Sequence, residues 1–150
     1  MSAVHFRALA PEDVRALAKG ESLVEETPWT QQDFEDVLTQ GWWAVVGEVA
    51  PGEIVSWAVM RVVLDEAELL TIGVMPEAQR QGIGEATLRE LMDRLVAEKI
   101  ARCFLEVRES NQRAQRLYAK IGFQVVGRRR DYYRQGEGRE DAILMRWGEE

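Results

Sequence analysis

Residues 79–85 form a glycine-containing turn between two patterns of apolar residues, a β-strand before it and an amphipathic helix after it. The turn consists of Gln79, Arg80, Gln81, Gly82, Ile83, Gly84 and Glu85. The first turn of a helix has N–H groups without partners inside the helix, and its dipole favours an anion there. Because glycine has no β-carbon, Gly82 and Gly84 let a phosphate approach the backbone, and Arg80 adds a charged donor. The segment therefore predicts a phosphate-binding turn that leads into a helix.

Two common nucleotide-binding motifs do not fit this turn. A dinucleotide-binding fingerprint would place a glycine at position 87, where this chain has Thr87, and a P-loop would continue with lysine and then serine or threonine. An ordinary tight turn before a helix, with no ligand, is the alternative. Phosphate binding is the interpretation that also accounts for Arg80 and for both glycines.

The composition restricts the chemistry that the chain can carry out. The chain has 150 residues and a net charge of −7, with one cysteine, Cys103, and one histidine, His5. A single cysteine excludes an internal disulfide and is typical of a reducing compartment, so we expect a cytoplasmic protein. With one histidine, we expect no Ser–His or Cys–His relay and no metal site. The acidity argues against direct binding of nucleic acid, and no apolar run reaches the roughly 20 residues of a membrane span.

Hydrophobic periodicity and turn residues predict one domain over residues 1–150. We expect strands at residues 4–9, 42–49, 54–64, 68–74, 102–108, 123–133 and 140–147, and helices at 11–20, 30–41, from 83 onward, and at 111–120. Thr30 with Asp33 is typical of a helix N-cap, and Gly20 and Gly41 are expected to end the first two helices. The last two strands flank residues 136–138. This order indicates a mixed α/β sandwich in which Cys103 shares a buried strand face with its neighbours at alternate positions.

From Val62 to Met145 the chain resembles the GNAT superfamily of acetyltransferases. Residues 79–84 match its Q/R-x-x-G-x-G/A motif, which binds the pyrophosphate of coenzyme A. Further segments resemble the bacterial ribosomal-protein-alanine N-acetyltransferases, a family within that superfamily: residues 63–67, 105–108, 110–111, 117–118, 122–123 and 138–142. Before residue 62 the resemblance is limited to features such as Pro28 and Trp29. It implies a mixed, mostly antiparallel central sheet of about seven strands, splayed in the middle and flanked by about four helices.

The resemblance also implies acetyl-coenzyme A as the acetyl donor, with no metal. The implied cofactor-binding residues are Ile72, Gly73, Val74, Arg80, Gln81, Gly82, Ile83, Gly84, Glu85 and Asn111. The first three match the strand that pairs with the pantetheine arm, and a glycine within a strand fits a bulge or a close backbone approach. The family more often has a basic residue where this chain has Glu85. Asn111 also fits a plain helix N-cap, and one side chain can serve both purposes.

Two residues match the catalytic positions of the family. Glu106, near the end of a strand, matches the general base, and Tyr118, on the following helix, matches the general acid. Transfer to an amine requires both, because the attacking amine must be neutral and the leaving thiolate must be protonated. The alternatives are a surface carboxylate for Glu106 and a core aromatic for Tyr118.

The implied acceptor is the N-terminal alanine of a small-subunit ribosomal protein. Acidic side chains outnumber basic ones in residues 1–70, which suits a basic peptide, although a solubilising surface is the alternative. Candidate wall residues are Glu25, Glu26, Trp29, Tyr132 and Tyr133. Three other functions are kept as alternatives: an acetyltransferase for another peptide or a small-molecule amine, a non-catalytic module that binds acetyl-coenzyme A, and a nucleotide-binding regulator.

Overall fold

The computed structural model describes residues 3–135 and 138–149. Its strands are β1 (His5–Ala8), β2 (Trp43–Glu48), β3 (Ile54–Val63), β4 (Glu66–Val74), β5 (Arg102–Arg108), β6 (Gln124–Gln135) and β7 (Gly138–Gly148). Its helices are α1 (Val14–Val24), α2 (Gln31–Gln40), α3 (Ile83–Ala97) and α4 (Gln112–Ile121), with short 3-10 turns at Pro11–Asp13 and Pro76–Ala78. This is the order that the sequence predicts. Gly136 and Glu137, which the sequence places in the last turn, lie outside the described residues.

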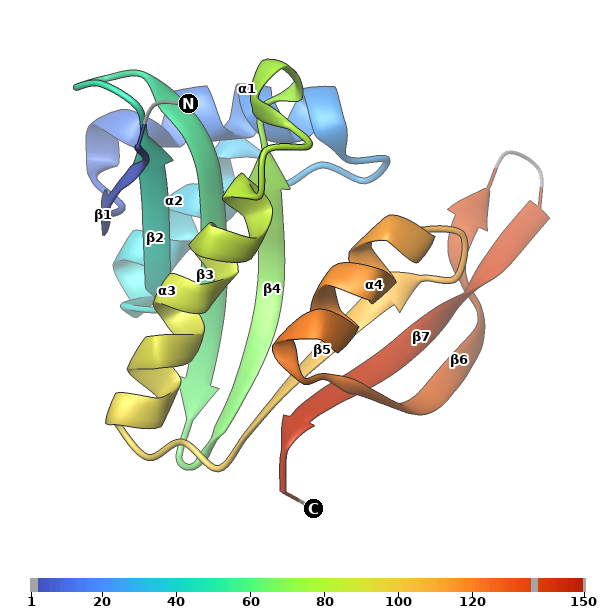
Figure 1. Ribbon diagram of the computed structural model, residues 1–150. Coiled ribbons are helices and arrows are strands. Elements are labelled where there is room, and N and C mark those ends of the chain that lie inside the picture. The colour runs from blue at the N-terminus through green and yellow to red at the C-terminus, as the bar shows by residue number, and fades with distance from the viewer. Residues whose placement is uncertain (1–2, 136–137, 150) are drawn as a thin grey trace.

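The strands form one sheet in the order β1-β2-β3-β4-β5-β7-β6. All neighbouring strands are antiparallel except β4 and β5, which are parallel. In Figure 1, α3 and α4 lie in front of the sheet and α1 and α2 lie behind it. The predicted architecture, a mostly antiparallel sheet of about seven strands with about four helices, is therefore confirmed for the part of the chain that the structure describes.

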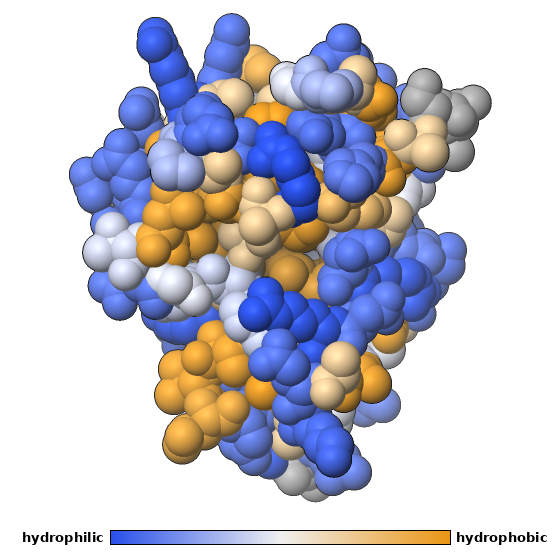
Figure 2. Space-filling model, turned by 90° about the vertical axis from the view of Figure 1, so that its left-hand side faces the viewer, coloured by the Kyte–Doolittle hydropathy of each residue, from blue (hydrophilic) through white to orange (hydrophobic). Residues whose placement is uncertain are grey.

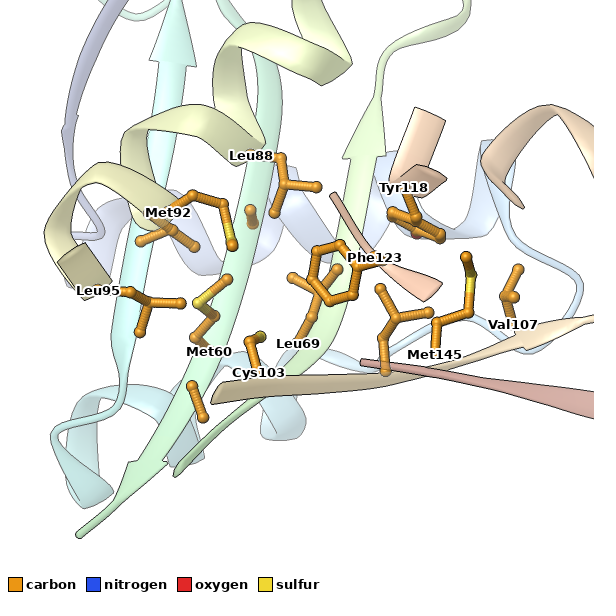
Figure 3. Close-up of a cluster of buried hydrophobic side chains, with 14 of the residues drawn as sticks. Met60, Leu69, Leu88, Met92, Leu95, Cys103, Val107, Tyr118, Phe123 and Met145 are labelled. Atoms are coloured by element: carbon orange, nitrogen blue, oxygen red, sulfur yellow. The ribbon is translucent and has the colours of Figure 1, made fainter. Parts of the chain in front are cut away.

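Apolar side chains pack on both faces of the sheet. Under α3 and α4, Leu88 and Leu95 pack with Met60 and Phe123 in a buried cluster, which Figure 3 shows. Under α1 and α2, a second cluster surrounds Trp57. Burying one such side chain stabilises the fold by roughly 1.5–3 kcal/mol. Cys103 is fully buried in the first cluster, and desolvation raises the pKa of its thiol to about 12, which confirms its interpretation as a core residue.

Helix boundaries follow the predicted signals with one exception. Thr30 caps α2 by accepting a hydrogen bond from the backbone N–H of Asp33, and Gly41 follows this helix with a left-handed backbone. The prediction that the first helix ends at Gly20 is wrong, because α1 continues to Val24. The reason is packing: a β-carbon at position 20 would lie 2.7 Å from the ring of Trp57. At this position, glycine allows α1 to pack closely against β3, and it does not end the helix.

The sheet opens between β4 and β5. These strands pair only at their beginnings, where residues 66–68 face residues 102–104. Farther along they diverge, as Figure 1 shows. The pairing of β4 with β3 shifts at Leu70, since Val59 faces Thr71 whereas Met60 faces Leu69. This irregularity is a bulge, which bends a strand and increases its twist. The predicted splay is confirmed, and the second half of β4 has one edge that is not paired with β5.

On the face of the molecule drawn in Figure 2, hydrophilic residues surround several hydrophobic areas. Among the large exposed apolar residues are Val63 and Leu64 at the turn between β3 and β4. In the described part of the chain, no helix is both long enough and apolar enough to cross a membrane.

Candidate active site

Two adjoining hollows lie along the opening between β4 and β5. The first hollow, of about 400 Å³, is lined by the end of β4, by the turn before α3 and by the start of α4. The second hollow, of about 570 Å³, is lined by β4, β5, the segment after α1 and the aromatic residues of β6. Four residues line both hollows: Glu25, Ile72, Asn111 and Tyr118. The two spaces therefore meet at these side chains.

The turn before α3 gives the first hollow a set of backbone donors. Gly82 takes the N-cap position of α3 in the left-handed conformation, with φ of +77°, and no side chain of the described residues caps this helix. The first N–H groups of α3 have no carbonyl partner inside the helix. A β-carbon built at Gly82 would have no heavy atom within 4 Å, so the backbone here faces open space. Such a helix start fits a phosphate group.

The arginine before that turn has an unusual backbone. Arg80 adopts φ of +65°, a region that non-glycine residues rarely occupy, and its side chain lines the first hollow. The side-chain amide of Gln79 donates a hydrogen bond of 3.1 Å to the carbonyl of Val74, which ties the turn to the end of β4. The turn is thus held beside the strand that lines the same hollow.

Gly73 on β4 lies opposite Trp57 on the neighbouring strand β3. A β-carbon at this position would lie 2.2 Å from the ring of Trp57, so no other residue can keep this packing. The indole N–H of Trp57 in turn donates a hydrogen bond of 2.7 Å to Glu21. The absence of a β-carbon at Gly73 thus makes room for the ring of Trp57, and the approach of the pantetheine arm to this residue stays a prediction.

Glu21 is a buried carboxylate that joins three elements. Besides the indole of Trp57, it accepts hydrogen bonds from the hydroxyl of Thr71 at 2.7 Å and from the backbone N–H of Trp29 at 2.9 Å. Buried carboxylates are stable only when they are hydrogen-bonded in this way. Glu21 therefore holds the segment after α1 against the bulged part of β4, where both hollows are bounded.

Glu106 lies on β5 and faces the second hollow. Its carboxylate is partly buried and lies 3.3 Å from the guanidinium of Arg129 on β6. Tyr133, on the same strand, lines this hollow too, and burial together with the charge of Glu106 raises its pKa to about 12. Glu106 and Tyr133 thus lie in the wall of the same hollow, and Tyr133 stays neutral near neutral pH.

Tyr118 projects from α4 to the junction of the two hollows. Its ring packs edge-on against Phe123 at 5.9 Å between centroids, at the margin of the cluster in Figure 3. Burial raises the pKa of the Tyr118 hydroxyl above its ordinary value, and the charge of Glu25 adds to this effect. A protonated hydroxyl at this junction is suited to donate a proton.

Comparisons with known proteins agree with this geometry. A family model described as "Acetyltransferase (GNAT) family" matches residues 11–123. The chain belongs to the GNAT acetyltransferase family. The bS18-alanine N-acetyltransferase of Escherichia coli K12 is 39% identical over 92% of this chain and 93% of that protein. A Bacillus subtilis protein named as a putative enzyme of the same kind is 31% identical over 93% of this chain and 91% of that protein.

A solved structure extends the likeness to three dimensions. The crystal structure of the ribosomal-protein-S18-alanine N-acetyltransferase from E. coli superposes with a TM-score of 0.90 at 36% identity. It covers 97% of this chain and 93% of that chain. At this coverage the likeness extends into the part of the chain before residue 62, where sequence alone offered little more than Pro28 and Trp29.

Most of the predicted GNAT cofactor residues gather around the first hollow. Residues 72–74, Arg80, Gly82, Ile83, Gly84, Glu85 and Asn111 all line it. Gln81 is exposed and does not line it. The carboxylate of Glu85 lies 2.8 Å from Lys120 and 3.0 Å from Arg89, and these cations lower its pKa. The acidic residue at this GNAT position is therefore neutralised by neighbours on α3 and α4.

The walls of the two hollows include a residue that the sequence analysis did not predict, and they exclude one that it did predict. Arg113, on the first turn of α4, lines the first hollow and adds a second cation to Arg80. Its signal in the sequence is its position two residues after the helix cap Asn111, whose side chain accepts a hydrogen bond from Ala114. Glu26, expected in the wall of the acceptor site, lines neither hollow.

The described residues offer no metal site. Among residues 3–135 and 138–149, no group of three or more His, Cys, Asp or Glu side chains is arranged to hold a metal ion.

Proposed function

We propose that this protein transfers the acetyl group of acetyl-coenzyme A to the N-terminal α-amine of a protein, by direct transfer in a ternary complex. The acceptor we propose is the N-terminal alanine of a small-subunit ribosomal protein, in the cytoplasm. Residues 1–150 would act as one N-acetyltransferase domain. The observation that carries the proposal is the pair of hollows that meet at Tyr118 and Glu25, one with an anion-binding helix start and one with acidic walls.

The first hollow fits coenzyme A in charge and shape. The start of α3 would bind the pyrophosphate, with Arg80 and Arg113 as charged donors. The unpaired edge of β4 at residues 72–74 would offer backbone groups to the pantetheine arm, which would bring the thioester to Tyr118. Acetyl-coenzyme A is the acetyl donor of GNAT enzymes, and the family membership supports the same donor here.

The second hollow supports a cationic acceptor. Its wall carries the carboxylates of Glu25, Asp33, Glu68 and Glu106. These would attract the protonated N-terminus of a basic peptide. Tyr132 and Tyr133 on β6 would cover the peptide backbone, with Arg108 stacked on the ring of Tyr133 at 4.3 Å. The E. coli relative is named for the alanine of ribosomal protein bS18, which is an acceptor of this kind.

The roles proposed for Glu106 and Tyr118 follow from their positions. Glu106 would accept a proton from the amine nitrogen as the N–C bond forms, and Tyr118 would protonate the sulfur of the departing coenzyme A. A peptide α-amine has a reference pKa near 8, against roughly 10.4 for lysine, so a carboxylate suffices more easily for the α-amine. This difference favours a protein N-terminus over a lysine side chain.

The function can be tested by mass spectrometry of protein N-termini from cells with and without this enzyme. We expect acetylation of one ribosomal N-terminal alanine to disappear when the enzyme is absent. Purified enzyme should then acetylate a synthetic peptide of that sequence and spare a copy whose α-amine is blocked. Transfer only to small-molecule amines would overturn the protein-acceptor assignment. Acetyl-coenzyme A binding without transfer to any amine would make the chain a binding module.

Placement of the pyrophosphate leads to a prediction at Gly84. A β-carbon there would meet Val74 at 3.5 Å and Leu117 at 3.8 Å, which are ordinary contacts, so Gly84→Ala should bind acetyl-coenzyme A nearly as wild type does. Gly84→Val adds branches where the backbone would meet phosphate. Loss of one hydrogen bond to a charged group costs about 1.5–3 kcal/mol, which is roughly a ten- to hundredfold weaker Kd. Calorimetry that gives equal affinities for both variants and wild type would contradict the placement.

A further inference from the structure

Glu25 is a carboxylate at the junction of the two hollows. It follows directly after α1, and it lines both hollows, whereas Glu106 lines only the second. The residue is exposed to solvent, and it forms part of the wall of each hollow. A group in this place is reachable from the peptide side and from the thioester side.

The surroundings of Glu25 favour its protonated form. Its pKa is raised to about 7, mainly by desolvation and also by the nearby charges of Glu21 and Glu26, while Arg108 on β5 lowers it. Two tyrosines also face it, Tyr118 on α4 and Tyr133 on β6, and both remain neutral near this pH. A group that titrates near pH 7 can both take up and release a proton under working conditions.

Glu25 is held in place by the buried carboxylate one helical turn before it. Glu21 accepts three hydrogen bonds, from Trp57, from Thr71 and from the backbone of Trp29. Because Glu21 and Trp29 stand on either side of Glu25 in the chain, these bonds fix both ends of the short segment that carries it. The segment therefore presents Glu25 to the hollows from a rigid base.

An ammonium group must lose two protons when it is acetylated. A protonated amine must lose one proton before it can attack and a second after the N–C bond has formed. Glu106 is one proton acceptor in the proposed function. We propose that Glu25 is the other: it is a catalytic residue that deprotonates the incoming ammonium group, and this role rests on the proposed amine transfer.

The steps balance when the two carboxylates act in turn. Glu25 takes the first proton, which leaves a neutral amine with a lone pair that forms the N–C bond to the thioester carbonyl carbon. Glu106 takes the second proton from that nitrogen. As the C–S bond breaks, the sulfur leaves with the bonding pair and receives a proton from Tyr118. The proton on Glu106 returns to Tyr118 through water, and the proton on Glu25 passes to solvent, so the products are amide, thiol and one H⁺.

The test compares Glu25→Gln with a matched control, Glu26→Gln, which removes the neighbouring carboxylate that lines neither hollow. The measurement is kcat/KM between pH 5.5 and 9.5, with acetyl-coenzyme A and a peptide amine. Without Glu25, only the amine that is already neutral reacts. The pH at which kcat/KM reaches half its maximum should therefore rise from about 7 toward the pKa of the amine, near 8. Below pH 7 this shift corresponds to a roughly tenfold lower kcat/KM. Above about pH 9 the two curves should meet. Glu26→Gln should keep the wild-type midpoint or lower it slightly, because it removes a nearby negative charge.

A second acceptor separates proton removal from a structural role. A peptide that begins with trifluoroalanine has an amine that is already neutral at pH 7, so the ratio of wild-type to Glu25→Gln rates should fall close to one. An equal loss at every pH, a profile that does not change, or the same ratio for both peptides would overturn the proposal. If only a small-molecule amine is acetylated, the peptide assignment fails and the same profiles with that amine decide the role of Glu25. If no amine is acetylated, both proposals are wrong.

Discussion

Replacing Glu106 with glutamine is expected to slow acetyl transfer by roughly a hundredfold to ten-thousandfold near neutral pH, the range typical for loss of a general base. Glutamine keeps the size of the side chain and its position on β5, but it cannot accept a proton. In the variant, hydroxide must take the second proton of the amine, so the rate should continue to rise with pH where the wild-type rate levels off. The pH–rate profile therefore shifts upward. Initial rates with a peptide acceptor from pH 6 to 10 measure both effects.

A neighbouring ion pair provides the control for this substitution. Glu106 pairs with Arg129 at 3.3 Å, and Glu109 pairs with Arg128 at 3.0 Å on the same strand, β6. Ion pairs near the surface contribute about 1 kcal/mol or less to stability, so neither variant should unfold. Glu109→Gln loses an ion pair outside both hollows, where Arg128 keeps its second partner Asp141, and it should keep the wild-type rate. If Glu106→Gln retains the rate and profile of Glu109→Gln, Glu106 has a structural role.

The two carboxylate variants should differ in their pH dependence. Glu25→Gln should regain the wild-type rate above about pH 9, where the α-amine is neutral without help. Glu106→Gln should remain slow there, because a neutral amine still has a proton to lose after it attacks. One set of profiles thus distinguishes the proton removed before attack from the proton removed after it.

Local signals predicted most of the fold correctly. The Thr30 cap, the left-handed Gly41 and the Asn111 cap each depend on a few adjacent residues, and all three are found. Gly20 shows where such reasoning fails, because the same residue that ends a helix can also admit a tryptophan from another element. Trp57 lies far from Gly20 in the chain, so only tertiary packing shows whether this glycine ends the helix or makes room for the tryptophan ring.

The sequence predicted the part of the candidate site that lies in one continuous segment, but tertiary packing brings other residues together. The motif at residues 79–84 lies in one continuous segment, and its residues line the first hollow except Gln81, which is exposed. The place of Glu25 at the junction depends on how the segment after α1 lies against β4, through the hydrogen bonds of Glu21. The pairing of Glu85 with Lys120 depends on how α3 meets α4. Neither follows from spacing along the chain.

Tyr118→Phe is expected to produce a folded protein that binds both substrates and turns over very slowly. The substitution removes one hydroxyl and almost no volume, so the ring should keep its edge-on packing against Phe123 at 5.9 Å. Loss of one hydrogen-bonding group costs only about 1 kcal/mol of stability. Loss of general acid catalysis typically costs roughly a hundredfold to ten-thousandfold in rate. Thermal unfolding, calorimetry with acetyl-coenzyme A and steady-state kinetics measure the three properties separately.

The leaving group of the thioester distinguishes acid catalysis by Tyr118 from packing. A thiolate derived from a more acidic thiol needs less help from a proton donor, so Tyr118→Phe should lose less rate with such an acetyl thioester than with acetyl-coenzyme A. Tyr133→Phe removes a hydroxyl from the second hollow and should keep the wild-type dependence on the leaving group. A Tyr118→Phe variant that turns over at nearly the wild-type rate would rule out this residue as the acid. The same conclusion would follow if its slow turnover were explained by unfolding or were equal for both thioesters.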